Sequence, residues 1–61
     1  MDAKQIRTNQ ALKVTGGEYQ GIAGDVVEVV DGGAVIHCAG NFNGEPINEN
    51  LLIEAENLEI L

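Results

Sequence analysis

His37 and Cys38 are the only histidine and the only cysteine of this 61-residue chain, and both residue types can bind metals or act in catalysis. Their adjacency argues against a shared site, because neighbouring residues of a strand point to opposite faces. A zinc site also needs three or four ligands. We therefore expect no bound metal, with Cys38 packed as a small apolar residue and His37 at the surface or hydrogen-bonded locally.

Carboxylates are the other side chains that could take part in chemistry. The chain has ten Asp and Glu against three Lys and Arg, which gives a net charge of −7. Asp25, Glu28 and Asp31 recur at a spacing of three, which alternates between the faces of a strand. Neither a calcium-loop pattern nor a phosphate-binding loop is present, and His37 has no identifiable catalytic partner. The sequence predicts solvated carboxylates, no cofactor, no catalytic residue and a protein that is not an enzyme.

The charges are unevenly distributed along the chain. Its three cations, Lys4, Arg7 and Lys13, all lie within the first thirteen residues, and only carboxylates follow. Affinity for nucleic acids comes largely from Lys and Arg that neutralise phosphates, so an anionic surface would repel a duplex. We expect a protein partner with a basic surface, facing a carboxylate-rich surface made by Glu18, Asp25, Glu28 and Asp31.

Glycines and short β-branched runs predict an all-β chain. Residues 16–24 are expected to form a loop shaped by Gly17, Gly21 and Gly24, which can adopt positive φ. In the following run, Val26 and Val29 differ by an odd number, which predicts a β-bulge near residues 27–28 or burial on both faces. Strands are predicted at residues 10–15, 25–30, 34–39 and 47–53.

Two turns and the tail complete the predicted sheet. Asp31-Gly32-Gly33 favours a primed hairpin turn or a bulged relative, and Asn43-Gly44 is the expected tip of a second turn. The tail has two alternatives: a helical turn over residues 54–57 followed by a short strand over 58–61, or one helix from Asn50 to Leu61.

Sixty-one residues make one domain at most. Residues 1–9 are expected to be a flexible lead-in, and residues 10–61 the folded domain. A single cysteine excludes an internal disulfide, and no apolar stretch of signal or membrane-spanning length is present, so a cytoplasmic protein is expected. The core is predicted from the aliphatic residues Ile6, Leu12, Val14, Val26, Val29, Val35, Ile36, Ile47, Leu52, Ile53, Leu58 and Ile60.

One further pattern spans residues 12–38 and consists of Val14, the segment Gly17-Glu18-Tyr19-Gln20-Gly21, Gly24, Val26 and Val29. In these elements the chain resembles a KOW motif, the β-loop-β unit of ribosomal proteins and transcription elongation factors. The resemblance covers about half of the chain and implies a five-stranded SH3-like barrel whose later strands the remaining residues would supply. RNA-contacting members carry Lys or Arg beside the glycines, whereas this chain has Glu18, Gln20 and Asp25.

These observations predict a small acidic module for protein–protein interaction. Tyr19 and Phe42, the only aromatic residues, would either anchor a partner or cap the end of the barrel. The apolar strip Leu58–Leu61 would close the barrel or support a homo-oligomer. The alternative function is a ribosome- or transcription-associated accessory protein with weak nucleic-acid contact through Lys4, Arg7 and Lys13.

Overall fold

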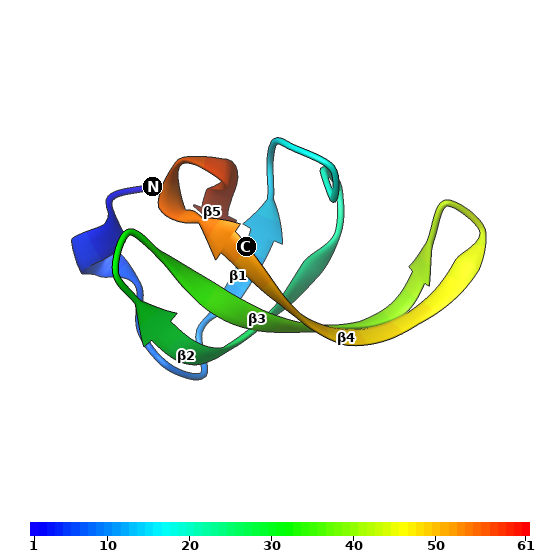
Figure 1. Cartoon of the computed structure of the whole chain (residues 1–61), viewed down its shortest axis with the longest axis horizontal. Helices are drawn as coiled ribbons and strands as arrows, with labels where there is room; N and C mark the ends of the chain where they lie inside the picture. The colour runs from blue at the N-terminus through cyan, green and yellow to red at the C-terminus, as the bar shows by residue number, and fades with distance from the viewer.

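Short apolar runs separated by glycine-containing turns form one antiparallel sheet of five strands in the computed structural model, which describes residues 1–61 (Figure 1). The sheet order is β4-β3-β2-β1-β5, and the sheet is not closed. The predicted all-β class is confirmed. The strands are β1 (Ala11–Val14), β2 (Ala23–Val30), β3 (Gly33–Phe42), β4 (Glu45–Glu54) and β5 (Leu58–Ile60), with the 3-10 turns η1 (Ala3–Gln5) and η2 (Ala55–Asn57).

Two tight turns connect β2 to β3 and β3 to β4. Asn43 and Gly44 both have positive φ, 52° and 81°, as a type I′ hairpin requires, and the predicted tip is confirmed. The turn between β2 and β3 also lies where it was predicted. Of its two central residues only Gly32 has a positive φ, 78°. The φ of Asp31 is not positive, as is usual for residues that carry a Cβ atom. This turn is therefore not of the primed types.

A bulge in β2 determines which carboxylates share a face. The pairing with β3 shifts between Val26 and Glu28, as predicted from the apolar pattern. Asp25 pairs with His37 and Glu28 pairs with Val35, two residues apart on β3. Since residues two apart on a strand share a face, Asp25 and Glu28 both lie on the outer face of the sheet. The prediction that their spacing alternates between faces is wrong, because the bulge adds one residue.

The loop between β1 and β2 depends on glycine for two different reasons. Gly17 and Gly21 have φ of 85° and 100°, as predicted for a sharply turning backbone. Gly24 instead lies within β2, paired with Leu12, so the loop ends two residues earlier than predicted. A Cβ at Gly24 would lie 2.3 Å from the backbone oxygen of His37. Close approach of β3, rather than positive φ, requires this glycine.

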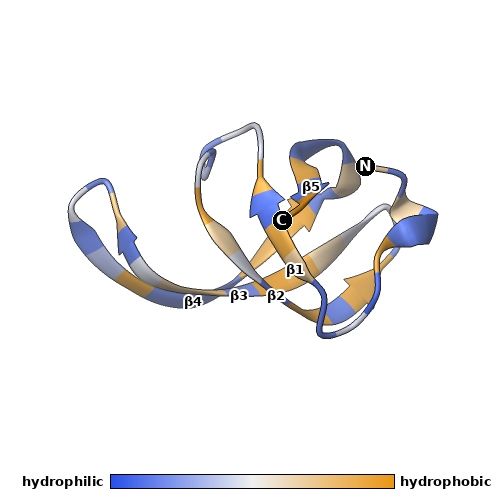
Figure 2. Cartoon of the chain, turned by 180° about the vertical axis from the view of Figure 1, so that it is seen from behind, coloured by the Kyte–Doolittle hydropathy of each residue, from blue (hydrophilic) through white to orange (hydrophobic).

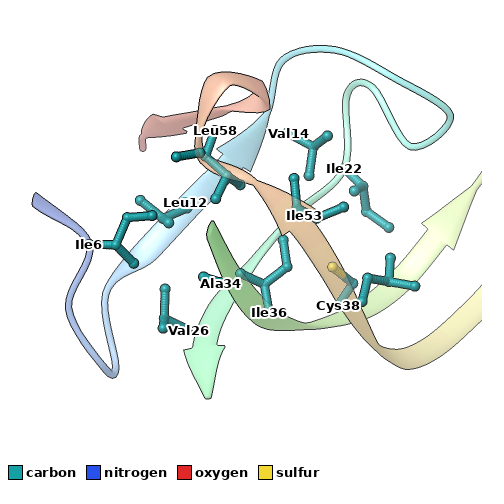
Figure 3. Close-up of a cluster of buried hydrophobic side chains, with 12 residues drawn as sticks. Ile6, Leu12, Val14, Ile22, Val26, Ala34, Ile36, Cys38, Ile53 and Leu58 are labelled. Atoms are coloured by element: carbon teal, nitrogen blue, oxygen red, sulfur yellow. The ribbon is translucent and has the colours of Figure 1, made fainter. Parts of the chain in front are cut away.

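Twelve buried side chains form the core between the sheet and the segments that fold over it (Figure 3). Seven of the twelve predicted members are present. Val35 and Ile47 are only partly buried, and Val29, Leu52 and Ile60 are 43%, 69% and 59% exposed. Leu52 pairs with Val35 on the outer face of the sheet, so its neighbours on β4, Leu51 and Ile53, point into the core instead. The core consists of Ile6, Leu12, Val14, Ile22, Val26, Ala34, Ile36, Cys38, Leu51, Ile53, Ala55 and Leu58.

Both ends of the chain pack on the sheet. The tail forms η2 and then β5, which pairs with β1, so the alternative of one continuous C-terminal helix is wrong. In residues 1–9, the expected lead-in, Ile6 is buried and the amino group of Met1 donates to the carbonyls of Ala55 (2.8 Å) and Leu58 (2.9 Å). No helix is long or apolar enough to cross a membrane.

The β3–β4 hairpin extends beyond the rest of the sheet. Past His37, β3 pairs only with β4, and residues 39–49 form a two-stranded ribbon that gives the molecule its longest extent, 33 Å against 19 and 18 Å (Figure 1). We call residues 39–49 the ribbon. It carries far fewer apolar residues than the sheet from which it grows (Figure 2). Two regions result: a sheet with a core, and a projecting ribbon.

Candidate functional site: a pocket between the ribbon and the β1–β2 loop

Tyr19 and Phe42, the two aromatic residues, meet where the β1–β2 loop approaches the ribbon. Their ring centroids lie 5.7 Å apart at an interplanar angle of 45°, within the range of attractive aromatic pairs. Both side chains are partly buried and pack against the edge of the core. The pair thus packs on the edge of the core and keeps part of its aromatic surface exposed.

The aromatic pair forms one end of a pocket of about 360 Å³. Strand register explains the other walls. Glu45, Ile47 and Glu49 are alternate residues of β4, and Glu49 pairs with the buried Cys38, so all three project from the face that forms the core farther along the strand. The pocket is lined by Tyr19, Phe42, Asn43, Glu45, Pro46, Ile47 and Glu49.

The pocket has two carboxylates and no positive side chain among its lining residues. The three cations of the chain lie elsewhere. Lys4 belongs to η1, and the Nη1 atom of Arg7 donates to the backbone oxygens of Lys4 (2.7 Å) and Ile6 (3.1 Å). Lys13, on β1, pairs across the sheet with Glu59 of β5. Glu45 and Glu49 therefore depend on solvent or a ligand for a counter-charge.

The acidic residues expected to form one surface come from three places. Asp25 and Glu28 share the outer face of β2, and Asp31 lies in the turn at the end of β3 opposite to the ribbon. Glu18 lines a separate hollow of about 200 Å³, together with Leu52 and Glu54. Of the four, only Asp25 and Glu28 are brought to one face by the strand pairing.

A pair of carboxyl groups adjoins η2. The protonated carboxyl group of Glu54 can donate a hydrogen bond to the carboxylate of Glu56, and this bond, together with the negative charge of Glu56, raises the pKa of Glu54. A like charge so close disfavours the ionised form of Glu54. The carboxylates at this end of β4 therefore face each other, whereas Glu45 and Glu49, at the other end, face a pocket.

His37 and Cys38 lie on opposite faces of β3, as predicted. The Nδ1 atom of His37 donates to the Oδ1 atom of Asn50 (2.8 Å) on the exposed face, and Cys38 is fully buried. Burial raises the pKa of the Cys38 thiol. No three metal-binding side chains gather anywhere in the structure. On the outer face His37 pairs with Asp25 of β2.

The terminal strip is divided between the core and the surface. Leu58 is buried opposite Val14, whereas Ile60 and Leu61 are 59% and 71% exposed. Leu61 borders a shallow hollow of about 280 Å³ on the outer face, beside Ala11 and Ala23. Only Leu58 of the strip therefore packs in the core, and the other three residues are exposed to solvent.

Sequence reasoning selected Tyr19 and Phe42 but missed their contact and the β4 residues of the pocket. A signal for the β4 residues exists: Glu45, Ile47 and Glu49 follow the Asn43-Gly44 turn at the spacing that places them on one face of a strand. Comparison with protein-family models, curated proteins and solved structures finds no match to this chain.

Proposed function

We propose that this protein is a small, non-catalytic module that binds a basic segment of another protein. The observation that carries this proposal is the pocket in which an aromatic pair and an aliphatic residue are flanked by two carboxylates without a counter-ion. Cations are attracted both to aromatic faces and to carboxylates. A net charge of −7 adds long-range attraction for a basic partner, which increases the rate of encounter.

We further propose that the fold is an SH3-like barrel with a KOW-type β1–loop–β2 unit. Support comes from the meander order β4-β3-β2-β1-β5 and from the 3-10 turn η2 that precedes β5. It also comes from the positive φ of Gly17 and Gly21, in the loop where the KOW resemblance lies. The single, buried Cys38 is compatible with the proposed cytoplasmic location, where thiols stay reduced.

Chemical-shift mapping tests the proposed function. The labelled protein is titrated with a mixture of short Lys- and Arg-containing peptides, with an equivalent acidic mixture as the control. We expect saturable shifts in the amides of Tyr19, Phe42 and Ile47 with the basic mixture alone, weakening as salt rises. Shifts confined to residues near Lys4, Arg7 and Lys13 on addition of a short RNA would overturn the proposal in favour of the nucleic-acid alternative.

A further inference from the structure

On the face of the ribbon that borders the pocket, acidic and aliphatic side chains alternate in a regular series. A general attraction for cations does not explain this series. Along β4, a carboxylate, an aliphatic side chain and a second carboxylate alternate on one face, at Glu45, Ile47 and Glu49. At about 3.4 Å per residue, successive members of this series are about 7 Å apart and the two carboxylates about 14 Å apart. One cationic side chain cannot neutralise both carboxylates at that separation.

An extended chain carries side chains on one face at the same spacing. A segment with basic residues at positions i and i+4 and an apolar residue at i+2 would oppose both carboxylates and the apolar centre at once. Ile47 pairs with Gly40, which has no side chain to cover it, and the rings of Tyr19 and Phe42 lie at the end of the same pocket. A pocket of about 360 Å³ holds one aliphatic side chain with room for the stem of a neighbouring Lys or Arg.

We infer that the ligand is an extended protein segment of the pattern basic-x-apolar-x-basic, bound along β4 with its apolar residue over Ile47. This inference rests on the proposed function and adds the register of the ligand to it. The occupant is a different protein rather than a second copy, because each copy has a net charge of −7 and two copies would repel each other. The chain's own three cations lie outside the pocket.

The intrinsic fluorescence of Tyr19 provides the assay, because it is the only tyrosine in a chain without tryptophan. The probes are capped pentapeptides without aromatic residues: Arg-Ser-Leu-Ser-Arg, its permutation Arg-Arg-Leu-Ser-Ser, and Glu-Ser-Leu-Ser-Glu. We expect the first to bind at least about tenfold more tightly than the second, since the permutation cannot place a charge against each carboxylate. The acidic peptide should not change the fluorescence.

Substitutions then locate the two charges of the peptide. Glu45→Gln and Glu49→Gln should each weaken Arg-Ser-Leu-Ser-Arg by about three- to tenfold and leave the permuted peptide less affected. Glu28→Gln is the matched control, because it removes the same charge from the outer face of β2 and should change the affinity less than about twofold. All three positions are exposed, so the variants should melt with the original protein.

The two proposals fail in different ways. Equal affinity for the two basic peptides, with equal losses at Glu45 and Glu28, would overturn the inferred register and leave a basic-segment binder. Failure of every basic peptide to perturb the pocket, both here and in the chemical-shift mapping, would overturn the proposed function and the inference together.

Discussion

The two halves of the β3–β4 hairpin use the same alternation of side chains for different purposes. In the half nearer the sheet, inward positions carry Ile36, Leu51 and Ile53, which are buried by the rest of the molecule. In the ribbon, the same face carries Glu45, Ile47 and Glu49 and borders an open pocket. The pleat that places residues in a core therefore also places a row of ligand-facing residues once the strands extend past their neighbours.

The largest difference between the folded core and the ribbon should appear when an apolar side chain is truncated in each. Leu12 is fully buried, and Leu12→Ala should lower the free energy of unfolding by about 2–5 kcal/mol, enough to unfold much of a domain of this size. Ile47→Ala, in the ribbon, should lower it by about 1 kcal/mol or less because the side chain is only half-buried. Urea unfolding measures both variants, and equal losses would contradict the division into core and ribbon.

Replacing two glycines by alanine should distinguish a glycine that close packing requires from one that a positive φ requires. In Gly24→Ala the new Cβ would meet the backbone oxygen of His37 at 2.3 Å, so we expect a loss of about 3 kcal/mol. Gly21→Ala meets no atom within 4 Å and should lose about 1–2 kcal/mol, from its positive φ alone. Thermal unfolding ranks the two variants, and the reverse order would show that β2 and β3 are not packed this closely.

Much of this sheet could be predicted from the sequence. The odd separation of Val26 and Val29 predicted a bulge or burial on both faces, and the bulge occurs. The Asn43-Gly44 turn lies where it was predicted, and the short last strand was one of the two alternatives for the tail. Leu51 and Leu52 were harder, because two adjacent leucines are equivalent until the register with β3 selects which one faces the core. The contact between Tyr19 and Phe42 depends on tertiary structure, since no local pattern joins a loop to the end of a distant strand.

Cys38 marks the boundary between core and ribbon, and pH should reveal its burial. Because the folded state raises the thiol pKa, the folded chain holds this proton more tightly than the unfolded chain, whose thiol has a pKa of about 8.5. The resulting stability is complete below about pH 8.5 and is lost as the pH rises through the folded pKa. The difference in unfolding free energy between the original protein and Cys38→Ala should therefore shrink above that pH. A constant difference would place Cys38 at the surface.

The smallest effect should come from the carboxylates at the other end of β4. The pKa of Glu54 is raised by Glu56, so its contribution to stability is complete below about pH 4.3 and is lost as the pH rises through the folded pKa. Glu54→Gln should raise the melting temperature slightly at pH 7 and not below pH 4. Glu45→Gln, which removes the same charge from the other end of β4, serves as the control. A larger gain for Glu45→Gln at pH 7 would contradict this assignment of the repulsion.

The most direct test of a binding ribbon separable from the folded core is Phe42→Ala, examined for stability and for binding in the same preparation. We predict a loss of about 1 kcal/mol or less in unfolding free energy, because Phe42 is only partly buried. We also predict at least a tenfold loss of affinity for Arg-Ser-Leu-Ser-Arg. Destabilisation as large as that of Leu12→Ala, with the peptide affinity of the remaining folded protein unchanged, would contradict the account.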